Sequence, residues 1–252
     1  MRRSRSGSGW TLVVPVRDPR TGKTRLNSSP TLNTAIAADT VSAALASPAV
    51  RRIILVTDDL DWIPQSIHQD FRCTPMLQSS VDEDRKKDYE ALKMMNDGPA
   101  SPTSALNRAV SEAVQRALRE SGRPSAVAVM PGDLPALRPG DLSAALRLAR
   151  GVPRGMVSDH TGTGTTLLTA RGVGGEAHRP RFGRDSALRH RQEGYQELPL
   201  PPRSSLRRDV DSPEDLLAVQ DRLGARTRGS AEVSRLLGQP AQIPAASGSG
   251  GR

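Results

Sequence analysis

Aromatic residues and cysteine are scarce in this sequence. Aromatic residues make up 2% of its 252 residues, and Cys73 is its single cysteine. One cysteine excludes an intrachain disulfide and argues against a structural zinc site, which needs several thiolate or imidazole ligands. The shortage of aromatic side chains leaves little surface for the base stacking by which proteins bind single-stranded nucleic acid.

Long apolar runs are also absent. No run approaches the roughly 18 residues that a helix needs to span a bilayer. The apolar segment at 10–16 is too short for the apolar region of a signal peptide, and it continues into Arg17 and Asp18. Together with the lone cysteine, these absences predict a cytoplasmic protein that acts away from the membrane.

The net charge of +9 first suggests a nucleic-acid partner, but the distribution of the charge weakens that interpretation. Residues 1–9 contain three arginines and no acid, and residues 225–252 contain four arginines and one glutamate. Both segments are rich in small and polar residues, so we expect them to be disordered tails. The single domain between them, residues 10–224, is only mildly basic, which suits the binding of small anions.

Strand and helix patterns alternate along the domain, which predicts an α/β fold with a mixed, mostly parallel sheet flanked by helices. Apolar runs predict strands at 11–16, 52–57 and 126–130. Helical periodicity predicts helices at 31–46, 104–121, 139–150 and 212–223. The last helix has Ser212 as its N-cap and Gly224 as its end. Residues 78–101 are polar and are expected to form a long surface insertion.

Ligands of such sheets bind outside the carboxyl ends of the strands, and the first loop there is Arg17–Leu26, RDPRTGKTRL. Its Gly-Lys-Thr resembles the end of a Walker phosphate loop, but Arg17 stands where that motif requires glycine. What remains is a loop whose cations Arg17, Lys23 and Arg25 can wrap a nucleoside triphosphate, with Lys23 near the α-phosphate. An exposed basic turn is the alternative interpretation.

Two acidic segments suggest a magnesium site. The strand at 126–130 delivers Asp133, within MPGDLPAL, to the carboxyl edge, where one or two carboxylates and phosphate oxygens suit Mg²⁺. Asp209 and Asp211 of RRDVD alternate on an extended segment, so only one of them can face Asp133. That one would complete a two-carboxylate site, and the other would pair with arginine or cap the next helix. A turn or capping role is the alternative for Asp133.

Two further segments offer ligands for an anion. Asp159–Thr166, DHTGTGTT, combines glycines that permit close backbone approach with threonine hydroxyls that can bind phosphate. In Arg181–His190, RFGRDSALRH, a turn at Gly183 leads to Ser186 at the start of a helix, which is a natural anion site. An ordinary hairpin and an ordinary N-cap are the alternatives. The four histidines, His68, His160, His178 and His190, show no metal-ligand spacing.

In this order, the segments resemble the CofC/FbiD family of coenzyme F-420 biosynthesis. The resemblance runs from Trp10 to Leu223, and GTGTT followed by FG-x-x-S and then RRDVD is its most specific part. It also covers Asp39-Thr40-Val41 in a helix and ALNRAV at Ala105–Val110. The family usually has lysine in place of Arg17 and glycine in place of Ala105.

The resemblance implies a single-domain nucleotidyltransferase fold of the GT-A, MobA-like kind, and it assigns roles to individual residues. Asp133 and Asp209, the latter favoured over Asp211, would bind magnesium. The phosphorylated acid would bind to Thr165, Gly183 and Ser186, with Thr166 replacing Thr165 if the register differs by one. GTP would be held by Arg17, Lys23 and Arg25, and Lys23 and Asp133 would be the catalytic residues.

The implied reaction transfers GMP from GTP to phosphoenolpyruvate, forming enolpyruvoyl-2-diphospho-5'-guanosine and pyrophosphate, and a downstream transferase of the same pathway would receive the product. The bias toward Arg, Ala, Gly and Pro suggests a high-GC bacterium, and bacterial members of the family are associated with phosphoenolpyruvate rather than 2-phospho-L-lactate. One alternative is another MobA-like enzyme, such as a molybdenum-cofactor guanylyl- or cytidylyltransferase, although the usual LAGGxSxRMG loop is absent here. The other is a non-enzymatic protein that binds anions or nucleic acid through its basic tails.

Overall fold

The structure, a computed structural model, describes residues 9–16, 26, 29–77, 102–121, 125–172 and 178–238. Its strands are β1 (Trp10–Val16), β2 (Val50–Thr57), β3 (Cys73–Leu77), β4 (Ser125–Val129), β5 (Arg154–Ser158), β6 (Thr165–Gly172) and β7 (Gln196–Glu197). Its α-helices are α1 (Pro30–Leu45), α2 (Gln65–His68), α4 (Pro102–Ser121), α5 (Pro139–Leu148), α6 (Ser186–Gln192), α7 (Pro213–Ala218), α8 (Ala225–Arg228) and α9 (Ala231–Gly238). Short 3-10 turns are η2 (Ala149–Gly151), η4 (Ser205–Arg207) and η5 (Gln220–Arg222).

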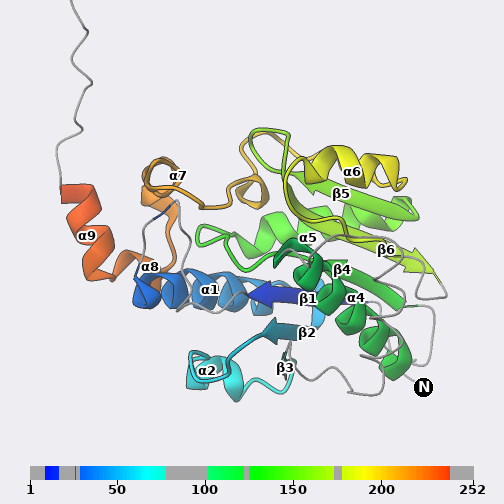
Figure 1. Cartoon of the computed structure of the whole chain (residues 1–252), viewed down its shortest axis with the longest axis horizontal. Coiled ribbons are helices and arrows are strands. Elements are labelled where there is room, and N and C mark those ends of the chain that lie inside the picture. Colours follow the sequence, from blue (N-terminus) through cyan, green and yellow to red (C-terminus); the bar gives the residue numbers. More distant parts are fainter. Residues whose placement is uncertain are drawn as a thin grey trace, which may run out of the picture.

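The described strands form one seven-stranded sheet in the order β3-β2-β1-β4-β6-β5-β7. β1 pairs in parallel with both β2 and β4, and β2 with β3, whereas β6 runs antiparallel to its neighbours β4 and β5. This arrangement confirms the predicted mixed, mostly parallel sheet (Figure 1). Because β1, β2, β4 and β5 point the same way, the loops that follow them meet at one edge.

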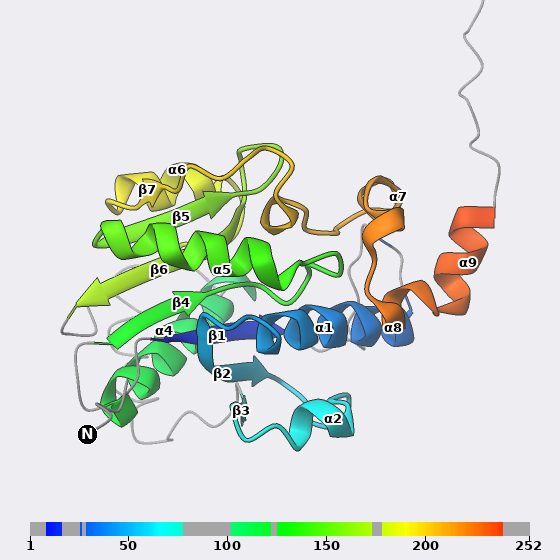
Figure 2. The same cartoon turned by 180° about the vertical axis from the view of Figure 1, so that it is seen from behind.

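Helices cover both faces of the sheet because its central strands are apolar on both sides. On one face, Leu12 and Val14 of β1 pack in a cluster with residues of α1 and α5. Figure 2 shows these two helices lying on the same side of the sheet. On the other face, Val13 joins a cluster with Ala109, Val110 and their neighbours on α4. Within the described part of the chain, no helix is long and apolar enough to cross a bilayer.

The predicted strands at 11–16, 52–57 and 126–130 are present as β1, β2 and β4, each shifted by at most two residues. The predicted helices at 31–46 and 104–121 are α1 and α4, and 139–150 covers α5 and most of the turn η2. Ser29 is the N-cap of α1, with its hydroxyl accepting a hydrogen bond from the Leu32 amide at 3.2 Å.

The helix predicted at 212–223 is wrong in length. Its start is correct, because Ser212 caps α7 and exchanges hydrogen bonds with Asp215 in a capping box. However, α7 ends at Ala218, and the turn η5 follows it. Val219 and Leu223 are both buried in one cluster with Leu32 of α1, so tertiary packing takes precedence over helical continuity in this segment.

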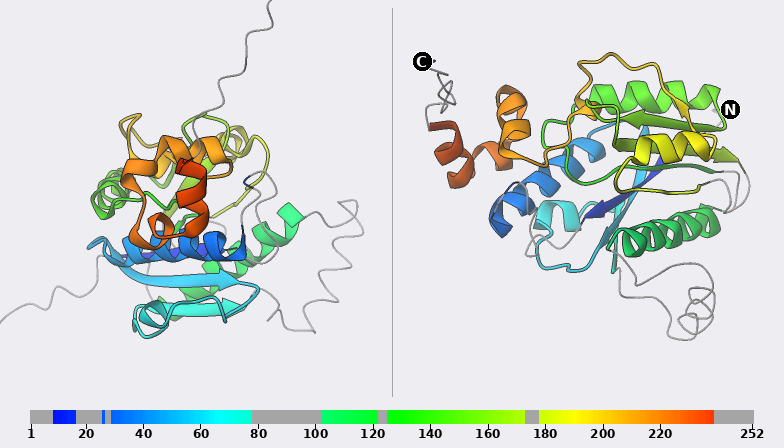
Figure 3. Two further views of the ribbon diagram at one scale, coloured as in Figure 1. Left: turned by 90° about the vertical axis from the view of Figure 1, so that its left-hand side faces the viewer. Right: turned by 45° about the horizontal axis from the view of Figure 1, so that its top comes forward.

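The tail predicted to be disordered from residue 225 instead begins with two helices, α8 and α9 (Figure 3). The buried carboxylate of Asp39 on α1 accepts hydrogen bonds from the backbone amide of Thr227 at 2.7 Å and from that of Arg226 at 3.3 Å. Val233 of α9 is fully buried, and Glu232 accepts hydrogen bonds from the Ser29 amide. The low apolar content therefore did not predict the conformation of residues 225–238, because a few apolar contacts and one buried acceptor order this segment.

Besides most of the loop at 17–26, three predicted segments lie wholly or largely outside the described residues. These are the N-terminal tail at 1–9, the insertion at 78–101 and the last part of the C-terminal tail, 239–252. The predictions made for them stay predictions.

The role of α8 and α9 can be tested by truncation. We expect a chain ending at Gly224 to be less stable than one ending at Gly238, because it exposes the site of Val233 and leaves the buried Asp39 carboxylate without its amide donors. Losing these contacts costs about 3 kcal/mol, or roughly 6–12 °C in Tm for a domain of this size. Thermal melts of the two chains measure the difference. Equal melting temperatures would show that α8 and α9 contribute no stability.

Candidate active site

Asp133 lies at the carboxyl end of β4 in a loop that is held on both sides. The amide of Gly132 donates to the Pro15 carbonyl at 3.1 Å, and a Cβ atom on Gly132 would lie 2.5 Å from a methyl of Val16. Only glycine therefore lets this loop approach β1 so closely. On the other side, the Leu134 amide donates to the hydroxyl of Thr40 at 3.0 Å. The backbone on either side of Asp133 is thus fixed to β1 and α1.

Asp209 reaches the same place from the last third of the chain. The amide of Val210 donates to the carbonyl of Asp133 at 3.0 Å, which joins the two segments directly. The Oδ1 atom of Asp209 is buried and has no hydrogen-bond partner among the described residues. Asp211 is exposed, as expected for the opposite side of an extended segment. Asp209, not Asp211, therefore provides a partly buried carboxylate beside Asp133.

The charge of this carboxylate is poorly compensated by the protein. Burial, together with the nearby carboxylates of Asp133, Asp211 and Asp159 in that order, raises the pKa of Asp209 to about 8. In the described ranges no group of three or more His, Cys, Asp or Glu side chains is arranged to hold a metal ion. Magnesium is commonly bound by one or two carboxylates together with substrate phosphates, so the Asp133–Asp209 pair fits that ion. A divalent cation would supply the missing positive charge.

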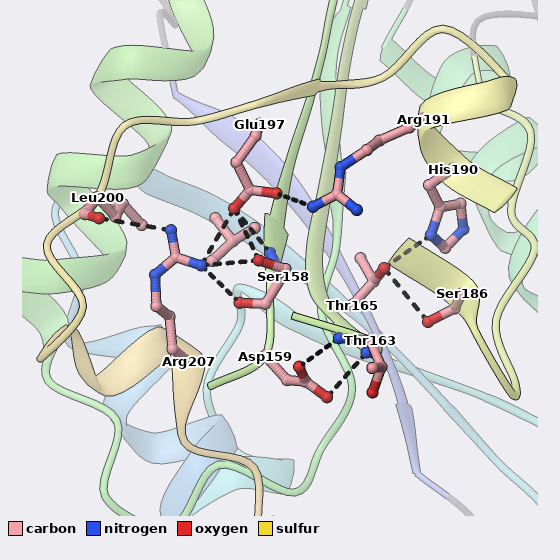
Figure 4. A network of polar contacts seen from close by, with 12 residues as sticks. Ser158, Asp159, Thr163, Thr165, Ser186, His190, Arg191, Glu197, Leu200 and Arg207 are labelled. Atoms are coloured by element: carbon pink, nitrogen blue, oxygen red, sulfur yellow. Dashed lines mark hydrogen bonds and ion pairs between the residues drawn. The ribbon is translucent and has the colours of Figure 1, made fainter. Parts of the chain in front are cut away.

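Arg207 anchors the segment that carries Asp209. Its side chain is only 13% exposed, and its Nη1 atom donates to the carbonyl and hydroxyl of Ser158 at 3.0 and 2.9 Å. The same nitrogen lies 3.1 Å from Glu197, which also accepts from the Ser158 amide at 3.1 Å (Figure 4). This ion pair ties the chain two residues before Asp209 to the end of β5.

The loop after β5 is organised by its own first residue. The carboxylate of Asp159 accepts from the amides of Thr163 at 3.1 Å and Gly164 at 2.9 Å. A Cβ atom on Gly164 would lie 2.4 Å from Asp159 Oδ2, so the loop requires glycine at this position. The glycines and threonine hydroxyls of this loop were predicted to cradle a phosphate, whereas the amides of Thr163 and Gly164 bind Asp159. The glycine requirement is thus structural.

The predicted acid-binding residues come together beside this loop. Thr165, at the start of β6, and Ser186, at the start of α6, place their hydroxyl oxygens 3.3 Å apart (Figure 4). Gly183 has a φ of 120°, and its carbonyl accepts from the Ser186 amide at 3.1 Å, so the turn before α6 requires glycine. The fallback residue Thr166 instead donates to the Val157 carbonyl at 3.3 Å. The hydroxyl pair therefore consists of Thr165 and Ser186.

Asn107 on α4 is a supporting residue that we did not single out from the sequence. Its side-chain amide donates to the Phe182 carbonyl at 3.2 Å and accepts from the Phe182 amide at 2.9 Å. This reciprocal pair fixes the chain immediately before Gly183. The signal was present in ALNRAV, where we considered only the residue at position 105.

The predicted nucleotide-binding residues Arg17, Lys23 and Arg25 lie outside the described residues. β1 leads into that loop at the same edge of the sheet at which Asp133 follows β4. Their contact with GTP stays a prediction.

Comparisons with known proteins give close relatives over nearly the whole chain. The phosphoenolpyruvate guanylyltransferase of Streptomyces scabiei is 40% identical over 235 residues, which cover 90% of this chain and 97% of the relative. The protein of the same name from Streptomyces coelicolor is 39% identical over 236 residues, with coverages of 90% and 97%. The chain belongs to the phosphoenolpyruvate guanylyltransferase family. This confirms the resemblance seen in the sequence, and it makes the chain a nucleotidyltransferase enzyme. A scan against protein-family models gives no match.

Solved structures confirm the fold of this guanylyltransferase-family chain. A protein described as a nucleotide-diphospho-sugar transferase from Desulfovibrio desulfuricans G20 superposes with a TM-score of 0.54 at 17% identity, covering 92% of this chain and 94% of that one. Rv0371c of Mycobacterium tuberculosis gives a TM-score of 0.51 at 17% identity, with coverages of 85% and 100%. At this identity the likeness concerns the fold alone.

The pKa of Asp209 predicts how the stability of the metal-free protein changes with pH. In the unfolded chain this carboxyl loses its proton near its ordinary pKa of 3.8, whereas in the folded chain it keeps the proton up to about pH 8. The folded chain is therefore stabilised most by this group below pH 4. That stabilisation is lost as the pH rises from about 4 to about 8, because the unfolded chain gives up the proton more easily than the folded chain does. We expect Asp209→Asn to be more stable than the wild type at pH 8.5, by at least about 1 kcal/mol, and much closer to it at pH 4.5.

Urea unfolding in the presence of EDTA at the two pH values measures this difference. Asp221→Asn, which removes an exposed carboxylate far along the chain from Asp133, is the matched control and should show no such pH dependence. A stability difference between Asp209→Asn and wild type that is the same at both pH values would contradict the burial argument.

Proposed function

We propose that this enzyme transfers GMP from GTP to phosphoenolpyruvate, with magnesium as cofactor, in coenzyme F-420 biosynthesis. The observation that carries the proposal is the pairing of Asp133 with Asp209 at the carboxyl edge of the sheet, in a chain about 40% identical to proteins named for this activity. The hydroxyl pair of Thr165 and Ser186 supports it by offering a second, anion-binding position.

Asp133 and Asp209 would hold the magnesium ion. When bound, magnesium supplies positive charge against the phosphates and against the negative charge that develops at the α-phosphorus of GTP. The backbone contacts of Gly132, Leu134 and Val210 keep the two carboxylates in place before any ligand arrives. This preorganisation lowers the cost of reaching the reactive arrangement.

The phosphorylated acid would lie against Thr165, Gly183 and Ser186. The Thr165 hydroxyl can donate to an anionic oxygen, and the tight turn at Gly183 exposes backbone close to the same place. Asn107 and Asp159 act indirectly, by fixing the turn and the loop that carry these groups. Arg17, Lys23 and Arg25 would bind the triphosphate of GTP, with Lys23 near the α-phosphate.

The reaction needs no general base. A phosphate oxygen of phosphoenolpyruvate is already an anion, and it attacks the α-phosphorus of GTP. The bond between the α-phosphorus and the bridging oxygen to the β-phosphate breaks, and pyrophosphate leaves with that electron pair. The product contains a diphosphate that links guanosine to the enolpyruvoyl group. Its activated diphosphate bond makes it a donor for a downstream transferase of the same pathway. The main barrier is the approach of two anions, so charge compensation and positioning dominate catalysis.

Pyrophosphate release tests the proposed substrate. Purified protein is incubated with Mg²⁺ and GTP, and phosphoenolpyruvate, 2-phospho-L-lactate or 3-phosphoglycerate is added singly. We expect release to depend on phosphoenolpyruvate and to be at least about tenfold slower with the other two acids, a difference of ~1.4 kcal/mol in the barrier. Pyrophosphate release that depends on 2-phospho-L-lactate would show that this acid, and not phosphoenolpyruvate, is the acceptor. No release with any acid would contradict the proposed function.

The same assay with Asp133→Asn examines the site. We expect this variant to keep its fold and to lose activity by roughly 100-fold or more, because a neutral amide replaces a metal-binding carboxylate. Asp221→Asn removes one carboxylate from an exposed position and should keep wild-type activity.

A further inference from the structure

His190 lies directly behind the Thr165–Ser186 hydroxyl pair and is fully buried. Its Nδ1 atom is 2.9 Å from the Thr165 hydroxyl oxygen (Figure 4), and its Nε2 atom is 2.8 Å from the backbone nitrogen of Arg181. A backbone amide can only donate, so Nε2 must present its lone pair to Arg181. A neutral imidazole carries one proton, and that proton therefore lies on Nδ1.

The surroundings keep His190 neutral at physiological pH. Burial lowers the pKa of the ring to about 4, and nearby Glu193 opposes this effect only in part. The rings of Phe182 and Tyr195 pack edge-on against it, with centroids 5.2 and 5.6 Å away. The ring therefore has one fixed orientation and one proton, which it donates to Thr165.

This donation decides what the Thr165 hydroxyl can do. A hydroxyl has one proton and two acceptor positions. The Nδ1–H group of His190 occupies one of these positions, and the Ser186 hydroxyl, 3.3 Å away, donates to the other. The remaining capacity of Thr165 is to donate its own proton. Such a donor favours an anionic oxygen over a neutral donor group.

We propose that His190 is a positioning residue that, together with the Arg181 amide, fixes the Thr165 hydroxyl as a hydrogen-bond donor to an anionic oxygen of the phosphorylated acid. The inference rests on the proposed function, in that it places the acid at Thr165 and Ser186. The Arg181 amide fixes the proton of His190 on Nδ1. That proton in turn fixes the direction in which the Thr165 hydroxyl donates.

His178 provides an internal reference. Its Nε2 atom is 2.8 Å from the Val127 carbonyl, which can only accept, and its Nδ1 atom is 3.2 Å from the Tyr195 hydroxyl. His178 must therefore carry its proton on Nε2. The two buried histidines of the described chain thus have opposite tautomers, although burial lowers the pKa of both.

The tautomer can be measured without any substrate. We expect ¹⁵N NMR of the histidine rings at pH 7 to show one buried ring protonated on Nδ1, absent from the spectrum of a His190→Gln variant, and a second buried ring protonated on Nε2. An Nε2-protonated or charged His190 would overturn the proposal. This result does not depend on whether the protein is active.

Kinetics of two variants test the role in binding. In His190→Asn the side-chain amide lies where Nδ1 was and can still donate to Thr165, whereas in His190→Gln it reaches the Nε2 position and contacts Arg181 instead. We expect His190→Gln to raise KM for phosphoenolpyruvate roughly tenfold, as for one lost hydrogen bond, with KM for GTP unchanged. His190→Asn should remain within about threefold of wild type, since it keeps the donor.

Thermal melts of both variants check the fold. Equal changes in KM for the two variants, or changes for GTP as large as for the acid, would indicate a merely structural role and overturn the proposal. Absence of activity in the wild type would instead remove the proposed function, and the tautomer measurement would still decide the state of His190.

Discussion

The site depends on one backbone hydrogen bond, from the amide of Val210 to the carbonyl of Asp133. It joins the end of β4 to a segment more than 70 residues further along the chain, and it sets Asp209 beside Asp133. The structure supports this bond from both sides. Gly132 and Leu134 tie the Asp133 loop to β1 and α1, while Arg207 ties the Asp209 segment to Ser158 and Glu197. Ser205 adds a further tie, since its amide donates to Asp141 of α5 at 2.7 Å.

The arrangement is electrostatically unfavourable in the protein alone. Asp209 is partly buried close to three other carboxylates, and its raised pKa expresses that cost. The contacts that hold the two segments together are backbone hydrogen bonds and the ion pair of Arg207 with Glu197. Under the proposed function, a cation bound between Asp133 and Asp209 would relieve this cost. At the same edge of the sheet, the starts of β6 and α6 carry the hydroxyl groups of Thr165 and Ser186 rather than carboxylates, which would suit the second anion of the proposed reaction.

Much of the fold could be predicted because its signals are local. Continuous apolar runs mark β1, β2 and β4, and helical periodicity marks α1 and α4. Predictions from the sequence were wrong where tertiary contacts determine the length or the order of a helix. α7 ends early because Val219 and Leu223 pack with Leu32, and α8 is ordered by a single buried carboxylate, Asp39. In the site, alternation in RRDVD showed that one aspartate faces Asp133 but could not say which. His190 was passed over because its role depends on an amide and a hydroxyl that only the fold places around it.

The central claim is that Asp133 and Asp209 together form the metal site. Anomalous diffraction from crystals grown with GTP and Mn²⁺ tests it directly, because manganese replaces magnesium and its position is seen without assumptions about the reaction. The account predicts an anomalous peak within coordination distance of both carboxylates, at about 2.0–2.3 Å from their oxygens. A peak bound by other residues, or one that contacts Asp211 in place of Asp209, would contradict it.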